Sequence, residues 1–289
     1  MNILLIGLGQ IAEAFIDKFN KCGDRVYLLT GQKENSFSTK RVFERYHFTY
    51  EDDSIHDIFE SVKPDISIFL GAFDGNFNWR DPRQESVRYT AALMNIMAAF
   101  SIVGSGRFVY FSSHEVYGGS YPNNVPESRS PSPRGFRAMA IAQGEEICAN
   151  YRRTQGMDIL ILRFDHLYCV PQRTKANHLH YGSAWEGPCF AMCLEALKSG
   201  HISASDREIF SLLFLTDAVE LSYKAISSGR LQRSLYHISA MEEITGTALA
   251  ELIREYLGGG IDILDNSVGD YHRVILDGGA FQKEFGQRI

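Results

Sequence analysis

The chain has 289 residues, 45% of them apolar and 22% charged, enough to bury the core of one large α/β domain or of two unequal lobes. Its formal net charge of -6, without a run rich in lysine and arginine, argues against nucleic-acid binding. No basic leader and no apolar run of membrane-spanning length is evident, so we expect neither a secretory signal nor a membrane partner. The five cysteines form no C-x-x-C pair and are typical of reduced thiols, so we expect a cytoplasmic protein.

Short runs of continuous apolarity alternate with helical patterns along most of the chain. The runs predict strands that are covered on both faces, and they span residues 2–6, 25–29, 66–70, 107–111, 158–162 and 210–215. The helices expected between and after them span residues 11–20, 55–62, 83–101, 135–152 and 217–228. This alternation predicts an α/β fold with a Rossmann-type, doubly wound parallel sheet and right-handed crossovers.

After about residue 165 the alternation loosens into a segment rich in polar and turn residues. We expect a smaller C-terminal substrate lobe over the carboxyl edge of the sheet. The expected division is a core of residues 1–165, to which 208–240 return, and a lobe of residues 166–207 and 241–289. His178 and His180 precede Cys189 and Cys193 here, but their spacing matches no common zinc pattern, and we expect no metal.

The first predicted strand leads into a glycine-containing turn, Gly7-Leu-Gly9-Gln-Ile-Ala12, and then into the first helix. Gly7 permits a tight turn, Gly9 lets the backbone approach a pyrophosphate, and Ala12 allows the helix to pack closely on the strand. The first turn of the helix, from Gln10 and Ile11, offers free N–H groups to an anion. The G-x-G-x-x-A pattern alone is weak evidence, but its place between strand and helix favours a dinucleotide site over a structural turn.

The end of the second predicted strand bears on the choice of dinucleotide. A carboxylate there would bind a ribose 2′-hydroxyl and favour NAD. The strand instead ends at Thr30 without a carboxylate, and Lys33, Lys40 and Arg41 follow. Small polar and cationic groups suit a 2′-phosphate, so NADP is favoured slightly over NAD, unless these residues are simply solvated loop charges.

Strand 107–111 runs directly into the polar residues Ser113, His114 and Glu115, and a proline-rich turn then leads to helix 135–152. This order resembles the extended short-chain dehydrogenase/reductase family, the NAD(P)-dependent sugar-nucleotide epimerases and dehydratases. In that family a serine or threonine near the strand end works with a Tyr-x-x-x-Lys pair on the next helix. The resemblance thus implies a nicotinamide cofactor and a sugar-nucleotide substrate.

The chain departs from the family pattern at the helix. Phe136 and Ala140 stand where the tyrosine and the lysine are expected. No tyrosine lies between residues 121 and 151, and no lysine lies between 63 and 175, so a shifted register does not restore the pair. Because one positioned acid or base contributes about 10²–10⁴ to a rate, ordinary tyrosine-mediated oxidoreduction should be severely impaired.

The remaining catalytic candidates are Ser113, Glu115 and His114. Ser113 aligns with the family's hydrogen-bond donor to the substrate oxygen, and Glu115 with the glutamate that dehydratases use as a base. His114 replaces an aspartate, and its ordinary pKa near 6.5 suits proton transfer at neutral pH. Three structural alternatives stay open: Ser113 caps a turn, His114 binds a backbone carbonyl, and Glu115 pairs with an arginine.

The resemblance continues in order along the chain and implies further contacts. Arg134 and Arg137 could replace the missing lysine charge, contact a substrate phosphate or be solvated, and Tyr117 is either a wall or a core residue. The candidate cofactor contacts are Gly7, Gly9, Gln10, Ile11, Ala12, Thr30, Lys33, Asp53, Gly71 and Ala72. The candidate substrate contacts are Tyr117, Arg134, Arg137, Arg163 and His166.

Two functions remain open. One is an atypical epimerase/dehydratase-like enzyme that acts on a sugar nucleotide or a related keto or hydroxy substrate. The other is a catalytically silent protein that binds a dinucleotide or sugar nucleotide and regulates or scaffolds a partner. The resemblance also implies a homodimer that forms through helices 83–101 and 135–152, of which the first is nearly devoid of charge between residues 89 and 100.

Overall fold

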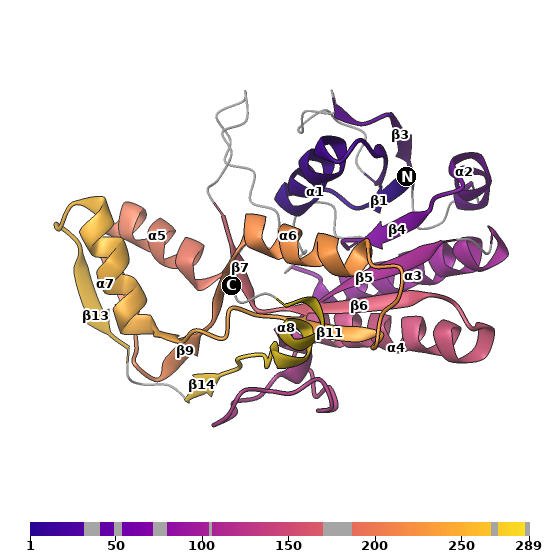
Figure 1. The fold of residues 1–289 in the computed structure, drawn as a ribbon. Coiled ribbons are helices and arrows are strands. Elements are labelled where there is room, and N and C mark those ends of the chain that lie inside the picture. Colours follow the sequence, from indigo (N-terminus) through magenta and orange to yellow (C-terminus); the bar gives the residue numbers. More distant parts are fainter. Residues whose placement is uncertain are drawn as a thin grey trace.

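The computed structural model describes residues 1–31, 41–48, 54–71, 80–103, 106–169, 187–266 and 271–286. Its centre is a seven-stranded sheet in the order β11-β6-β5-β4-β1-β2-β3, in which every neighbouring pair is parallel (Figure 1). The strands are β1 (Asn2–Ile6), β2 (Arg25–Thr30), β3 (Glu44–His47), β4 (Ile66–Phe69), β5 (Arg107–Ser113), β6 (Ile159–Phe164) and β11 (Leu235–Ile238). The strand order reverses between β1 and β4, which is where doubly wound sheets bind ligands. The predicted fold class is therefore confirmed.

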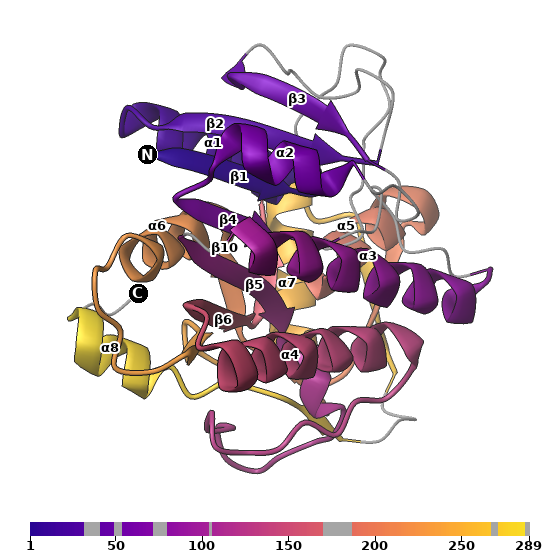
Figure 2. The ribbon, with the colours of Figure 1, turned by 90° about the vertical axis from the view of Figure 1, so that its right-hand side faces the viewer.

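Helices cover both faces of this sheet. One face carries α2 (Ile55–Val62), α3 (Pro82–Val103) and α4 (Phe136–Gln155), which lie in front of the sheet in Figure 2. The other face packs against α1 (Gln10–Lys21), α6 (Leu215–Ile226) and α8 (Gly279–Phe285). Along β1, Leu4 and Ile6 join the first cluster while Ile3 and Leu5 join the second. This burial on both faces explains why the strands are continuously apolar.

Helix α3 is, among the described residues, the one helix long and apolar enough to cross a membrane by length and composition. The sequence had indicated no such run. In the structure Leu93, Ile96 and Phe100 of this helix are buried in the cluster that also contains residues of α2 and α4. The core helix of a globular domain meets the same criterion, so burial of this face in the core accounts for part of its apolar character.

A smaller lobe lies at one end of the sheet, to the left in Figure 1. It contains α5 (Pro188–Ser199), β8 (His201–Ala204), β9 (Glu208–Phe210), β12 (Ile244–Thr245), α7 (Gly246–Leu257), β13 (Asp262–Asp265) and β14 (His272–Arg273). All of these elements except β14 contribute to a separate apolar cluster that includes Ile202, Phe210, Leu249 and Ile253. Helix α8, which the expected division places in the lobe, instead packs on the core, where the Phe281 ring lies 6.0 Å from that of Tyr236.

The prediction of one sheet strand at residues 210–215 is wrong. The segment holds the end of β9, the short strand β10 (Leu212–Phe214) and the start of α6, and none of it joins the main sheet. Strand β10 pairs instead with β7 (His166–Tyr168). A short apolar run cannot by itself separate a strand from the buried start of a helix. Strand β3 was not among the predicted strands, because this edge strand has the polar sequence Glu-Arg-Tyr-His and is only partly buried.

Candidate active site

The glycine turn after β1 has the shape of a phosphate cradle. Gly7 has φ 116°, and a Cβ built on it would lie 2.5 Å from the carbonyl oxygen of Gly71, so only glycine fits without a shift. Gly9 has φ 118° and caps α1, and a Cβ there would meet nothing within 4 Å. The first-turn N–H groups of α1 have no intrahelical partner and face this open side. These residues fit the pyrophosphate of a dinucleotide.

The neighbouring cofactor candidates lie at the start of α1 and at the end of β2. Gln10, Ile11 and Ala12 are buried at the start of α1, and the side-chain oxygen of Gln10 accepts a hydrogen bond from the Cys169 thiol. Thr30 is buried at the end of β2. Lys33, Asp53 and Ala72 lie outside the described residues. The choice between NAD and NADP stays a prediction, and Arg41 forms an ion pair with Asp17.

Replacement of Gly7 by alanine is expected to weaken dinucleotide binding at least tenfold. The added Cβ would meet a backbone oxygen at 2.5 Å, and the turn would force the alanine into a positive φ that residues with a side chain rarely adopt. Titration of NAD and NADP by calorimetry measures the loss. The matched control is Gly156→Ala, which also has a positive φ but lies at the far end of α4, where a Cβ has open space. Equal affinities in Gly7→Ala and wild type would exclude this turn as the binding site.

The second part of the site begins where β5 ends. Ser113 is the N-cap of a 3-10 helix, His114–Tyr117, and its hydroxyl accepts a hydrogen bond of 3.2 Å from the N–H of Glu115. The capping role considered for Ser113 is therefore present. Because the chain turns at Ser113, the residues that follow no longer alternate between the faces of a strand.

Glu115 is held by two neighbours. One carboxylate oxygen forms an ion pair with Nη1 of Arg137, and the hydroxyl of Ser113 lies 3.4 Å from the same oxygen. Arg137 comes from the first turn of α4, next to Phe136. Both members of the ion pair remain partly exposed. The structure thus gathers Ser113, Glu115 and Arg137 into one polar cluster at the carboxyl end of β5.

His114 lies beside this cluster but inside the protein, with its Nδ1 3.5 Å from the hydroxyl oxygen of Ser113. It is buried, its Nδ1 lies 3.3 Å from the carbonyl oxygen of Phe164, and its ring centroid lies 4.0 Å from that of His166. Burial lowers the pKa of both imidazoles; the nearby His114 lowers the pKa of His166 further, whereas Glu115 acts to raise the pKa of His114. His166 also packs edge-on against Phe210 of the lobe. The histidine pair is therefore neutral and joins the core to the lobe.

The positions of the missing tyrosine and lysine differ sharply in exposure. Phe136 begins α4 and is 44% exposed, whereas Ala140, one turn later, is 0% exposed. Ala140 belongs to the same apolar cluster as Val116 and Tyr117. The aromatic ring thus lies at the surface of the site, while the lysine position is filled by core packing. Arg134 is exposed on the preceding turn.

A buried polar network lies beneath the site and includes two of the substrate candidates. Arg163 donates two hydrogen bonds to Glu145, of 2.7 and 2.6 Å, and a third to the hydroxyl of Tyr117. That hydroxyl lies 2.8 Å from Nε2 of His237, and Ser112 donates to Glu145. Tyr117 and Arg163 therefore face the interior and do not join the polar cluster.

Sequence reasoning missed the partners in this network. A usable signal exists, because Arg163 is the one charged residue in the otherwise apolar strand β6 and so requires a buried partner. Glu145 lies on the buried side of α4 and supplies it. Burial and the nearby Arg163 charge lower the pKa of His237 to about 3, so this imidazole is neutral.

Asp165 is a further buried acid that the sequence did not single out. It follows β6, accepts hydrogen bonds from the hydroxyl of Ser239 and from the N–H of Leu276 at 3.2 Å, and so joins β11 to the C-terminal segment. Burial raises the pKa of this carboxyl to about 7, although its hydrogen bonds lower it. Asp165 therefore loses its proton close to neutral pH.

The Asp165→Asn variant is expected to gain stability relative to wild type as the pH rises. The carboxyl has a pKa of about 7 in the folded protein and about 3.9 in the unfolded chain. Its protonation therefore stabilises the folded state fully below pH ~4, and this stabilisation is lost as the pH rises from ~4 through ~7. Within this window the difference in unfolding free energy should change by roughly 1.4 kcal/mol per pH unit. Urea unfolding of both proteins at several pH values measures it, and parallel profiles would contradict the assignment.

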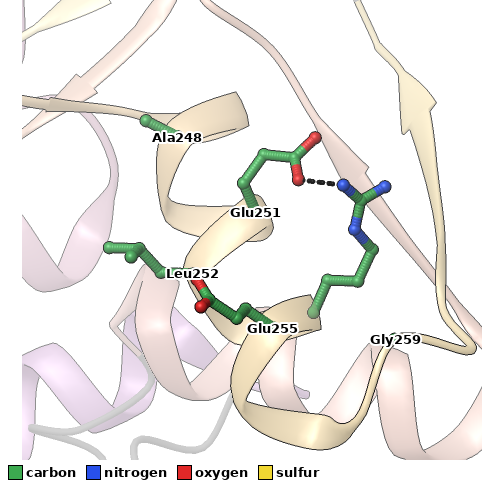
Figure 3. A pocket seen from close by; sticks show the side chains of 6 residues that line it. Ala248, Glu251, Leu252, Glu255 and Gly259 are labelled. Carbon is green, nitrogen blue, oxygen red and sulfur yellow. Dashed lines mark hydrogen bonds and ion pairs between the residues drawn. The ribbon is translucent and has the colours of Figure 1, made fainter.

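Two hollows lie away from this cluster. One, of about 690 Å³, is on the outer face of α7, where Glu251 and Arg254 form an ion pair and Ala248, Leu252, Glu255 and Gly259 complete the lining (Figure 3). The other, of about 290 Å³, lies between α1 and α6 and reaches Gln10 and Cys169. Among the described residues, the one group of three possible metal ligands is His56, Asp57 and Glu60 on α2. Neither hollow contains Ser113, Glu115 or Arg137.

Comparisons with known proteins find relatives of this chain. Residues 3–183 match the sequence model of the NAD dependent epimerase/dehydratase family. A dTDP-glucose 4,6-dehydratase of Streptomyces niveus is 28% identical over 189 residues, which cover 63% of this chain and 52% of that protein. A GDP-6-deoxy-D-mannose reductase of Pseudomonas aeruginosa is 31% identical over 122 residues, or 40% of each chain. The matches thus span about half the length, or less, of these relatives.

Solved structures show the same fold. The UDP-glucose 4-epimerase of Thermotoga maritima superposes with a TM-score of 0.81 at 19% identity, covering 98% of this chain and 92% of the other. A dTDP-glucose 4,6-dehydratase of Streptomyces venezuelae, solved with NAD, gives 0.80 at 19% identity, covering 100% and 92%. At such identities the likeness establishes the fold alone. Because the family match extends over more than half of its length, the chain belongs to the NAD-dependent epimerase/dehydratase family.

Proposed function

We propose that the protein is an NAD(P)-dependent enzyme of the epimerase/dehydratase type that acts on a sugar nucleotide with a non-standard active site. The observation that carries this proposal is the cluster of Ser113, Glu115 and Arg137 at the carboxyl end of β5. Strand β5 is parallel to β4, and β4 is parallel to β1. The cluster therefore lies at the same edge of the sheet as the glycine turn that follows β1.

The glycine turn would hold the dinucleotide. Gly7 and Gly9 would admit its pyrophosphate, and Thr30, at the end of the neighbouring strand, would lie toward the ribose. A bound nicotinamide would supply the reversible oxidation of a substrate hydroxyl group. All proton handling would then fall to side chains of the chain itself.

Within the cluster, Glu115 is suited to exchange a proton with the substrate. The ion pair with Arg137 fixes the orientation of this carboxylate. The Ser113 oxygen accepts from the Glu115 N–H, and its hydroxyl donates at 3.4 Å to the Glu115 carboxylate, so Ser113 would have to turn this hydroxyl hydrogen from Glu115 to a substrate oxygen. His114 has a positioning part only, because it is buried and hydrogen-bonded to a backbone carbonyl.

The direct test is to incubate the purified protein with NAD or NADP and a panel of UDP- and dTDP-sugars, with products identified by mass spectrometry. Turnover of at least one sugar nucleotide is expected. Ser113→Ala should lower its rate by about 10²–10³, the usual effect of removing one donor to a developing oxyanion. Absence of any turnover, or an unchanged rate in Ser113→Ala, would count against the proposal.

A second function is favoured by a specific observation. Phe136 carries no proton donor, and Ala140 is enclosed by core side chains, so neither of these positions on helix α4 can supply the family's proton transfer. This favours a regulatory function, in which the protein binds a dinucleotide or sugar nucleotide, does not convert it to product, and regulates a partner. Such a protein would show affinity for these ligands in calorimetry and no product in the panel assay.

We also propose a homodimer through α3 and α4. Large apolar side chains are exposed on both helices, namely Val87, Met94 and Ile102 on α3 and Phe136 and Met139 on α4. A pair of such faces would bury apolar area that is otherwise in contact with water. Sedimentation at several concentrations tests it, and a wild-type protein that sediments as a monomer throughout would refute it.

A further inference from the structure

The chain crosses between the core and the lobe at several points. It leaves the core after β6 at Asp165 and after β11 at Ser239, and it returns after β9 at Ser211 and after β14 at residues 274–276. Core and lobe keep separate apolar clusters. The orientation of the lobe therefore depends largely on the contacts of these crossing segments, and relative motion of two such bodies is the default expectation.

Asp165 lies where the crossing segments meet. Its carboxyl accepts hydrogen bonds from the hydroxyl of Ser239 and, at 3.2 Å, from the N–H of Leu276. Its own N–H donates to the carbonyl oxygen of Ile238 at 3.4 Å. The hydroxyl of Ser211 has no hydrogen-bond partner among the described residues, but it lies near enough to lower the pKa of the Asp165 carboxyl. All of these side chains are buried, and the junction of the crossing segments consists of Asp165, Ser211, Ser239 and Leu276.

The segment that leaves β11 carries a strained residue beside this junction. Met241 has φ 58°, and among the described residues the one other non-glycine residue with a positive φ, Lys63, caps the end of a helix. The N–H of Met241 donates to the hydroxyl oxygen of Ser239 at 2.9 Å, and its sulfur accepts from the N–H of Gly278 at 3.2 Å. Such strain persists where the surroundings fix the backbone, and strained residues are common where segments move.

We propose that Asp165 is the latch of a hinge between core and lobe, the side chain that holds the crossing segments together and so fixes the lobe against the core. The lobe loosens when the carboxyl releases Ser239 and Leu276. A hinge of this kind confines the change in backbone angles to a few residues, here 239–241. The inference concerns how the lobe is mounted and does not depend on turnover of a sugar nucleotide.

Protonation strengthens the latch. Burial raises the pKa of Asp165 to about 7, although its hydrogen bonds lower it. Because this pKa lies above the value of about 3.9 in an opened, solvated junction, the latch is strongest below pH ~4 and weakens as the pH rises through ~7. A protonated carboxyl still accepts from the N–H of Leu276 and can donate to the hydroxyl oxygen of Ser239.

Neighbouring ionisable groups do not account for this pH dependence. Within two residues of the four junction residues, the ionisable side chains other than that of Asp165 are Arg163, His166, His237 and Asp277. The arginine pairs with Glu145, burial keeps both imidazoles neutral, and the neighbouring aspartate accepts a hydrogen bond from the N–H of Gly279. None of them contributes to the pKa shift of Asp165, which arises from burial and hydrogen bonds.

The test measures amide hydrogen exchange at a contact between core and lobe that lies outside the junction. The N–H of Tyr121, in the loop that follows β5, donates to the carbonyl oxygen of Arg273 on β14 at 2.8 Å. The reference is the N–H of Leu70, which donates to the carbonyl oxygen of Ile6 at 2.9 Å in the core. The Tyr121 amide should exchange faster, because the hinge opens without unfolding the sheet. Equal rates at the two amides would mean that core and lobe separate only by global unfolding, and would overturn the proposal.

Asp165→Ala should raise the exchange rate of the Tyr121 amide about tenfold, the effect of leaving buried polar groups without their partner. Asp165→Asn keeps an acceptor for Leu276 and a polar group for Ser239, so it should stay within threefold of wild type at pH 6. The matched control is Asp277→Ala, which removes a carboxylate that binds an N–H of its own segment at 2.9 Å, and it should leave the rate unchanged.

A comparison of wild type with Asp165→Asn at each pH cancels the intrinsic pH dependence of exchange and remains possible if the alanine variant does not fold. Between pH 6 and pH 8 the Tyr121 rate in wild type should rise about tenfold relative to Asp165→Asn, because only the wild-type latch ionises. A ratio that stays constant over this range, or an Asp165→Ala rate within threefold of wild type, would overturn the proposal.

Discussion

Arg163→Met is expected to lower the free energy of unfolding by about 3–5 kcal/mol, because it leaves the buried carboxylate of Glu145 without its cation. The side chains of Arg163 and Glu145 are only 4% and 7% exposed, and two hydrogen bonds join them. The variant also removes the donor to the Tyr117 hydroxyl. Urea denaturation of both proteins measures the difference.

A double variant, Arg163→Met with Glu145→Leu, separates loss of the ion pair from exposure of a lone charge. Replacement of both partners by apolar residues of similar size is often close to neutral, so the double variant should be more stable than Arg163→Met alone. Arg153→Met, which breaks the exposed pair with Glu146, is the surface control and should cost less than about 1 kcal/mol. Equal losses in Arg163→Met and Arg153→Met would show that the buried network is not what stabilises this region.

Glu115→Gln is expected to reduce kcat by about 10²–10⁴ while leaving dinucleotide affinity unchanged. The substitution preserves the size of the side chain but removes the ionised oxygen that Arg137 orients. The glycine turn is separate from this carboxylate, so binding of NAD or NADP should not change. Rates are measured with whichever sugar nucleotide the wild type turns over, and affinities are measured by calorimetry.

The matched control is Glu146→Gln. Glu146 lies on the exposed side of α4, and its carboxylate pairs with Arg153 at 3.3 Å and not with Arg137. It should retain wild-type kcat. Arg137→Gln should fall between the two, because Glu115 remains present but loses its orienting cation. A Glu115→Gln rate within threefold of wild type would remove Glu115 from the catalytic machinery.

The fold was accessible from the sequence because its strands are buried on both faces. The run Ile3 to Ile6 gives alternate side chains to the two apolar clusters, which makes the whole run apolar. This rule fails where a strand lies at an edge, as in β3, and where an apolar run continues into a helix, as at Leu215. Position within the sheet and the start of a helix depend on contacts that a local pattern does not contain.

The candidate site could be predicted only in part from the sequence, for the same reason. The sequence located Ser113, His114 and Glu115 at a strand end, but their partners come from other elements. Arg137 is 22 residues from Glu115. The partners of His114, the carbonyl of Phe164 and the ring of His166, come from β6 and β7. These pairings depend on tertiary contacts, which a local sequence pattern does not contain.

We propose that the chain carries out its chemistry from the end of β5, without a tyrosine at position 136 or a lysine at position 140 of helix α4. The most direct measurement is product formation by wild type and by the Phe136→Tyr, Ala140→Lys variant, each saturated with dinucleotide and given the same sugar nucleotide. Wild type is expected to form product without these residues. A wild type that binds the dinucleotide but forms no product, beside a double variant that does, would contradict the claim and establish a silent binding protein.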